Sequence, residues 1–303
     1  MSKWLKPFGA LLLMIIVCSV IVRVTTGGQT LSEYAQENPE LAYATPEKTA
    51  SPSPFASPSP SASPSAAPDE ATPEIPSPES LSAICYEPGF FYEPLSEEII
   101  TRITGISYPV PEEEAMGGTV PAVNIMPSGK EAAINYGDLC YLTVLHYDFE
   151  GQVQTGNLIC NYGIAQDLLE IFYELYQNEY QIEKIRLIDE YDGDDTASME
   201  DNNTSCFNYR VVDGTDSLSK HALGCAIDIN PLYNPYVVYD YKGTGETYIS
   251  PSEGKTYADR SLDFPYKIDE NDLCYKLFKQ HGFIWGGDWN SCKDYQHFQK
   301  TDF

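Results

Sequence analysis

The sequence predicts an α+β fold in which helices flank an antiparallel sheet, preceded by an N-terminal apolar segment and a disordered Pro/Ser linker. Apolar residues alternate with polar ones beside turn residues, which predicts strands, and an amphipathic pattern at helical spacing follows them. Strands and helices then mix without a regular βαβ rhythm, which favours an antiparallel sheet over a parallel one. The sequence contains no internal repeat.

The first part of the globular region predicts a helix, a hairpin and a second helix. Residues 96–104 are typical of a short amphipathic helix with Ser96 as its N-cap. Residues 141–149 alternate like a strand, and a turn at Glu150-Gly151 leads into a second strand. Residues 164–176 carry apolar side chains at helical spacing, which is the clearest helical pattern in the chain.

The second part predicts short strands around one more helix. Leu273, Leu277 and Phe278 line one face of that helix, which is expected to stop at Gly282, the residue type preferred just beyond a helix C-terminus. Strands are expected at residues 184–188, 225–229, 283–285 and 295–299.

Three segments divide the 303 residues. In residues 1–24, Lys3 and Lys6 precede an apolar run that Arg23 closes, a pattern typical of a membrane anchor or signal segment with a cytoplasmic tip. We expect an uncleaved single-pass anchor with the rest of the chain outside the cell membrane. Cleavage of this segment would instead make the protein secreted.

Residues 25–84 form the predicted linker, and residues 85–303 form the globular domain. The linker repeats Ser-Pro pairs and has too few large apolar residues to build a core. Pro-rich linkers extend by roughly 3 Å per residue, so this one could hold a domain on the order of 100 Å from its anchor.

Charge limits the class of partner. The chain has 18 Lys and Arg residues against 45 Asp and Glu residues, a formal net charge of −27. Such a chain is repelled by phosphate backbones, so the composition disfavours a nucleic-acid partner.

The cysteines do not form a metal-binding pattern. Cys18 lies in the apolar run, and no Cys-x-x-Cys pair occurs among the remaining seven cysteines, so a zinc site built on thiolates has no support. Because seven is an odd number, at least one of these thiols lacks an intramolecular partner.

Residues 219–228 form the first motif that combines imidazole and carboxylate groups. His221 and Asp228 flank the small residues Gly224 and Ala226, which let the backbone turn and pack closely between the two side chains. Asp228 interrupts an apolar strand, where burial of a carboxylate is unfavourable unless it is paired or bound to a metal.

Residues 294–298 form the second motif, with Asp294 three positions before His297. Odd spacing sends two residues to opposite faces of a regular strand, so Asp294 is expected to reach the site of His297 from a preceding loop. Two His and one Asp are a three-ligand set typical of catalytic zinc. Spacing alone leaves ordinary hydrogen-bonded histidines and a capping carboxylate as an equally open interpretation.

The two motifs, together with Trp-Gly-Gly-Asp-Trp at residues 285–289, resemble the M15 zinc peptidases, the D-alanyl-D-alanine carboxypeptidase-like family. Within that family the likeness is to the branch of endolysins and L-Ala–D-Glu endopeptidases. Residues 202–210 resemble the segment upstream of the family's first motif, and the likeness runs from about Glu97 to the C-terminus.

The resemblance implies a Hedgehog/DD-peptidase-like zinc fold. It implies that Zn²⁺ is bound by His221, Asp228 and His297, and that Asp294 is the catalytic base. Many relatives use Glu for that base, whereas the endolysin-like branch uses Asp, so this departure points to the latter branch.

Arg210 matches an arginine of the family that could bind a substrate carboxylate or polarise the scissile carbonyl. The alternative is a structural ion pair with a nearby acid such as Asp213 or Asp216.

The activity that the resemblance implies is zinc-dependent hydrolysis of peptide bonds in peptidoglycan stem peptides, by a catalytic domain that we expect to be monomeric. Both the removal of terminal D-Ala and the cleavage of the L-Ala–D-Glu bond occur in the family. The alternative is a non-catalytic, zinc-containing wall-binding or signalling module on the same fold. The presence of both catalytic and metal-binding positions disfavours that alternative.

Three further residues are candidates for substrate binding: Ser219, Trp285 and Trp289. For the two tryptophans, packing in the core is an equally open interpretation. Four aspartates surround Gly193, but their spacing is not that of an EF-hand loop, so a solvated acidic turn is favoured over a calcium site.

Overall fold

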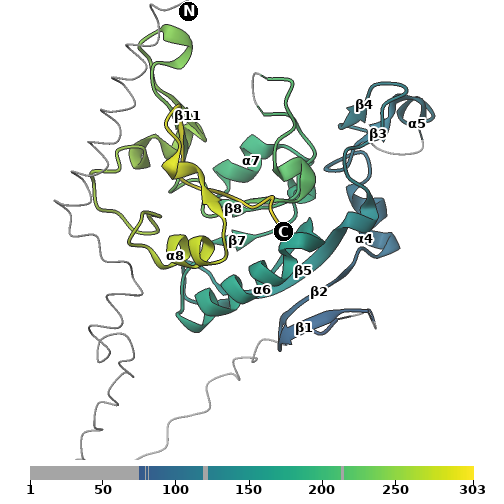
Figure 1. The fold of residues 1–303 in the computed structure, drawn as a ribbon, viewed down its shortest axis with the longest axis horizontal. Coiled ribbons are helices and arrows are strands. Elements are labelled where there is room, and N and C mark those ends of the chain that lie inside the picture. Colours follow the sequence, from purple (N-terminus) through teal and green to yellow (C-terminus); the bar gives the residue numbers. More distant parts are fainter. Residues whose placement is uncertain (1–74, 79, 81, 119–121, 213–214) are drawn as a thin grey trace, which may run out of the picture. The chain divides into compact units, whose positions relative to one another are not determined.

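The computed structural model describes residues 75–78, 80, 82–118, 122–212 and 215–303 (Figure 1). The predicted anchor at residues 1–24 and most of the predicted linker at residues 25–84 lie outside the described residues. Within the described part of the chain, no helix has the length and apolar character needed to cross a membrane.

The first sheet has four antiparallel strands in the order β1-β2-β5-β6. These strands are β1 (Ile84–Glu87), β2 (Phe90–Pro94), β5 (Leu139–Tyr147) and β6 (Val153–Asn161). The predicted hairpin is therefore confirmed, with its first strand starting and ending two residues earlier than expected. Gly151 lies in the turn between β5 and β6 at a φ of 72°.

Helix α6 (Tyr162–Gln177) packs against β5 and against α8 (Leu273–Gln280), as Figure 1 shows. Asn161 caps its N-terminus by accepting a hydrogen bond from the Gly163 N–H. The apolar face predicted for this helix is buried: Ile164, Leu168, Ile171, Phe172 and Leu175. Burial of this stripe on the sheet forms the centre of the main hydrophobic core, which extends to Phe278 and Phe298.

Two smaller antiparallel sheets follow, and each takes strands that are far apart in the sequence. One sheet has the order β12-β14-β9: β12 (Ile284–Trp285), β14 (His297–Gln299) and β9 (Ala226–Asp228). The other has the order β11-β10-β13: β11 (Tyr248–Ser250), β10 (Tyr236–Val238) and β13 (Lys293–Asp294).

Short elements connect these sheets. The first predicted helix is α4 (Glu97–Ile103), with Ser96 accepting a hydrogen bond from the Ile99 N–H as predicted. Two parallel strand pairs were not predicted: β3 (Val110–Pro111) with β4 (Ile125–Met126), and β7 (Lys184–Ile185) with β8 (Asn203–Thr204). The remaining helices of the described residues are α5 (Glu112–Met116) and α7 (Asp195–Glu200), and short 3₁₀ helices lie at residues 136–138, 188–191, 221–223, 241–243, 252–257 and 286–288.

All four strands predicted in the second part are shorter than expected: β7, β9, β12 and β14. Residues 184–188 alternate only as far as Leu187, because Ile188 and Asp189 are also buried and begin a 3₁₀ turn. Residues 295–299 form a strand only from His297 onward. The structure thus mixes helices with antiparallel sheets, as predicted, and the finer expectation of a Hedgehog/DD-peptidase-like fold stays a prediction.

Candidate metal centre

Strand pairing brings Asp228 and His297 together. In the antiparallel pair of β9 and β14, His297 lies directly opposite Asp228. Directly opposite residues project from the same face of the sheet with their Cβ atoms about 5 Å apart. The Nδ1 atom of His297 accordingly lies 3.0 Å from Oδ1 of Asp228.

His221 reaches the same point from the 3₁₀ turn that precedes β9. The turn ends at Gly224, which has a left-handed φ of 65°, and a Cβ at this position would lie 2.7 Å from the backbone nitrogen of Asn161. Glycine is therefore required both for the backbone conformation and for the close approach. The turn places Nε2 of His221 3.2 Å from Oδ2 of Asp228 and 3.1 Å from Nδ1 of His297.

The three side chains are all buried, and their ligand atoms lie within 4.8 Å of one another. Among the described residues, no other group of His, Cys, Asp or Glu side chains meets this criterion. Ligands bound at about 2.0–2.1 Å to a tetrahedral zinc lie roughly 3.3 Å from one another, close to the separations seen here. The donor set therefore fits zinc in size and in chemistry.

The remaining ring nitrogens are held by hydrogen bonds of their own. Nδ1 of His221 donates to the carbonyl of Cys206 at 2.5 Å, and Nε2 of His297 donates to Oε1 of Gln299 at 3.1 Å. With each ring neutral, these bonds would leave an unprotonated nitrogen of each ring facing Asp228, so that three acceptors converge on one point. A proton or a metal ion between these acceptors would balance their negative potential, and outer hydrogen bonds of this kind are typical of metal-binding histidines.

Electrostatics within the cluster favour the ionised carboxylate. Burial by itself raises the pKa of Asp228, but attraction to and hydrogen bonding with His221 and His297 outweigh it and hold that pKa well below its usual range. Burial lowers the pKa of His297, whereas its hydrogen bond with Asp228 and the charge of Asp228 raise it, for a net pKa of about 9. Both shifts express the same requirement for positive charge beside Asp228.

Asp294 lies at the end of β13, directly opposite Tyr236 of β10. The expectation that it would reach the site from a loop is wrong. The chain instead leaves one sheet after Asp294 and enters another at His297. The rule that residues three positions apart point to opposite faces of a strand does not apply, because the two residues lie on different strands. Burial raises the pKa of Asp294 to about 7, with His297 and Arg210 opposing the shift. Its Oδ1 atom has no hydrogen-bond partner among the described residues.

These groups line a cavity of about 320 Å³, which we call the metal cavity. Its lining contains the three candidate ligands and four other predicted site residues: Asp294, Arg210, Ser219 and Trp289. The hydroxyl of Ser219 accepts a hydrogen bond from the backbone N–H of His221, and the ring of Trp289 lies 5.4 Å from that of His297. The structure thus brings these predicted residues into one site.

Trp285 does not line the metal cavity. It is 3% exposed and its ring packs in the main core against Phe298 and Tyr275, with its indole N–H donating to the carbonyl of Tyr295. Of the two interpretations of this residue, core packing is therefore the one observed. Its position in β12 points its side chain to the core, whereas Trp289 follows the turn after that strand.

Arg210 pairs with Asp195 at the start of α7, at a distance of 2.7 Å between Nη2 and Oδ2. The sequence pattern assigns Asp195 to a solvated acidic turn and suggests Asp213 or Asp216 as partners of Arg210. Nothing in the local sequence indicates Asp195, because the two residues meet only through the tertiary fold. Gln299, by contrast, follows His297 by two positions on a strand and could have been identified from the strand period.

The other aspartates of the acidic turn have local tasks. Asp194 caps α7, Asp192 ends a 3₁₀ turn at a left-handed φ of 53°, and Asp189 accepts hydrogen bonds from Ser107. These contacts describe a turn held by local hydrogen bonds.

Comparison with protein families gave a match over residues 213–300, to the M15 peptidase model described as D-alanyl-D-alanine carboxypeptidase. The matched segment contains the three candidate ligands and Asp294, and Arg210 lies just before it. Comparisons with curated proteins and with solved structures gave no match. M15 peptidases are typically zinc-dependent, in agreement with the donor set. The match over this segment, and the candidate site residues that it contains, support an M15 family peptidase.

Proposed function

We propose that this chain is a zinc-dependent peptidase that hydrolyses peptide bonds in the stem peptides of peptidoglycan, outside the cell membrane. The observation that carries the proposal is the buried cluster of His221, Asp228 and His297, which shares one cavity with Asp294. The match to the M15 family supports the peptidase class.

The donor set favours a catalytic site over a structural one. Structural zinc sites are usually closed by four protein ligands, whereas catalytic sites use three and keep one position open. Three protein donors converge here, and the cavity beside them is large enough to admit part of a peptide. This arrangement argues against the alternative of a non-catalytic wall-binding or signalling module.

Each residue has a task in hydrolysis. The two histidines and Asp228 would hold Zn²⁺, which would supply a Lewis acid for a carbonyl group and for water. Asp294 accepts the proton of the attacking water at its unpartnered Oδ1 and returns it to the leaving amine. Arg210, held by Asp195, orients a substrate oxygen with its planar guanidinium group.

The experiment is digestion of purified peptidoglycan by the full-length chain, followed by mass spectrometry of the released stem peptides. Loss of a terminal D-Ala identifies a carboxypeptidase, and separation of L-Ala from D-Glu identifies an endopeptidase. We expect a chelator to abolish the reaction and added Zn²⁺ to restore it. Intact stem peptides after digestion with the zinc-loaded protein would overturn the proposal.

A further inference from the structure

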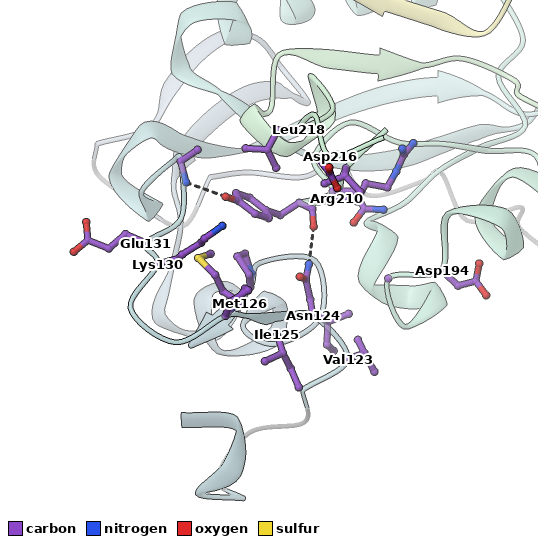
Figure 2. Close-up of a pocket in the computed structure, with 18 of the residues that line it drawn as sticks. Val123, Asn124, Ile125, Met126, Lys130, Glu131, Asp194, Arg210, Asp216 and Leu218 are labelled. Carbon is purple, nitrogen blue, oxygen red and sulfur yellow. Dashed lines mark hydrogen bonds between the residues drawn. The ribbon is translucent and has the colours of Figure 1, made fainter. Parts of the chain in front are cut away.

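A second cavity, of about 760 Å³, adjoins the metal cavity, and we call it the side cavity (Figure 2). Arg210 and Leu218 line both cavities, so the two spaces meet at these residues. Most of the side cavity is formed by residues before the matched family segment, including residues 123–127 around β4. Most of its lining therefore lies outside the matched segment.

The wall of the side cavity is held in place by the fold. The carbonyl of Tyr209 accepts a hydrogen bond from Nδ2 of Asn124 at 2.7 Å, and its hydroxyl accepts one from the N–H of Ala133 at 3.0 Å. Figure 2 shows both hydrogen bonds. A binding surface that is fixed before a ligand arrives loses less conformational entropy on binding.

One polar group in this wall has no partner. Asn208 lines the side cavity and is 4% exposed, yet its Nδ2 donor makes no hydrogen bond with any described residue. A buried donor without an acceptor is unfavourable by about 1–3 kcal/mol, and native structures contain few of them. The donor is suited to a carbonyl oxygen of a bound molecule.

The walls also present apolar surface that the protein leaves uncovered. Val123 is 67% exposed, Ile125 is 50% exposed and Leu218 is 37% exposed. In Figure 2, Val123 and Ile125 lie on the opposite side of the cavity from Leu218. A ligand with aliphatic groups between these walls would bury this surface.

Charge selects among such ligands. The ionisable groups of the side cavity are four carboxylates, Glu131, Asp192, Asp194 and Asp216, against two cations, Lys130 and Arg210. Arg210 is already paired with Asp195. Neither Asp192 nor Asp216 forms an ion pair with a described residue, so the cavity has an excess of negative charge that suits a cationic ligand group.

We infer that the side cavity is a substrate subsite for a peptide segment bearing a primary ammonium group, next to the bond being cut. A peptide backbone supplies the acceptor for Asn208, aliphatic side chains cover the apolar walls, and the ammonium faces Asp192 and Asp216. This inference rests on the proposed function, since it names the part of the substrate that extends beyond the metal cavity.

The test compares four versions of the stem peptide L-Ala–D-Glu–L-Lys–D-Ala–D-Ala: unmodified, acetylated at the terminal amine, acetylated at the lysine amine, and acetylated at both. We expect the zinc-loaded full-length chain to hydrolyse the doubly acetylated peptide with a kcat/KM about tenfold lower, as loss of two weak ion pairs predicts. The two singly acetylated peptides show which ammonium binds. Equal kcat/KM values for all four peptides would overturn the inference.

A charge-matched pair of variants locates the effect. Asp192→Asn with Asp216→Asn should abolish the preference for the ammonium-bearing peptide, and asparagine tolerates the left-handed backbone at position 192. Asp263→Asn with Glu270→Gln changes the net charge equally at exposed residues outside both cavities, and the preference should remain. Equal loss of preference in both double variants would show a general charge effect and contradict the subsite.

Asn208→Leu tests the unpartnered donor separately. The affinity for all four peptides should fall several-fold, while the melting temperature should not fall, because the removed donor has no partner among the described residues. A lower melting temperature with unchanged peptide affinity would make Asn208 a structural residue and remove it from the subsite.

Calorimetric binding of the same peptides to the zinc-loaded Asp294→Asn chain separates the two proposals. A preference for the ammonium-bearing peptides without hydrolysis by the wild-type chain would leave the subsite standing and overturn the proposed function. Hydrolysis of all four peptides without any preference in rate or binding would support the proposed function and overturn the subsite.

Discussion

Asp294 and His221 line the same cavity but have different tasks, so their variants should fail in different ways. His221→Ala should lose bound zinc, because it removes one of three ligands. Asp294→Asn should retain zinc and lose turnover by ~10²–10⁴-fold, the contribution typical of a general base. Metal analysis and stem-peptide hydrolysis on the same samples check both outcomes. Near-wild-type turnover in a zinc-loaded Asp294→Asn chain would remove Asp294 from the mechanism.

Arg210 can serve the substrate or the fold, and Arg210→Lys separates the two. Lysine keeps the charge that pairs with Asp195 but cannot reproduce the planar fork of donors. If Arg210 orients a substrate oxygen, turnover should fall strongly while zinc content and melting temperature stay near the wild-type values. If the residue is only structural, Arg210→Lys should be mild and Arg210→Ala should appear mainly as a lower melting temperature.

His146 in β5 should make stability depend on pH independently of the metal centre. It is buried, and its Nδ1 donates to the carbonyl of Ile182 at 2.7 Å. Burial lowers the pKa of His146 below its ordinary value of 6.5. Above pH 6.5 both the folded and unfolded states are neutral at this site, and as the pH falls below 6.5 the unfolded state binds the proton more readily. Stability should therefore decrease on acidification.

His146→Asn keeps a donor near the Nδ1 position and cannot be protonated. The free energy of unfolding is measured with denaturant at pH 7.5, 6.5 and 5.5. Between pH 6.5 and pH 5.5 the wild-type chain should lose more stability than the variant. The same pH dependence in both proteins would assign the effect to other groups.

At the scale of elements, the turn before β9 positions His221, and Gly224 makes that turn possible. Gly224→Ala adds a Cβ both to a left-handed backbone and to a position 2.7 Å from the backbone nitrogen of Asn161. Gly151→Ala is the matched control, because Gly151 has a similar φ of 72° and no atom within 4 Å of the added Cβ. The control should lose about 1 kcal/mol of stability from backbone strain alone.

Gly224→Ala should lose more stability than this control, and it should also weaken zinc binding, because relief of the contact displaces the turn that carries His221. Unfolding experiments and zinc titrations on both variants measure the two effects. Equal losses of stability and unchanged zinc affinity would show that the close approach has no consequence for the site.

At the scale of the whole molecule, the predicted anchor concerns where the activity takes place. The three candidate metal ligands all lie in the described part of the chain, between residues 221 and 297. Deletion of residues 1–24 should therefore move the protein from the membrane fraction to the soluble fraction while its catalytic constants stay unchanged. Recovery of the intact gene product from the medium, shortened near Ala44, would show a cleaved signal segment instead.

The sequence by itself determined the local features of this protein. The helical apolar spacing of α6, the β5–β6 hairpin and the Ser96 cap could be predicted because each depends on residues close together in the chain. Spacing left ordinary hydrogen-bonded histidines equally open, so the candidate ligands were expected only from the resemblance of the two motifs to the M15 peptidases; the structure brings the three side chains together.

Only the tertiary structure decided how distant segments meet. The register that sets His297 opposite Asp228, the pairing of Arg210 with Asp195 and the core position of Trp285 all depend on contacts between residues far apart in sequence. Asp294 lies on a strand of a different sheet from His297, which a spacing rule for one strand could not predict. The side cavity likewise forms where residues 123–127 pack beside residues 208–211. Periodicity reports which face of an element is buried, whereas long-range packing selects the partner that buries it.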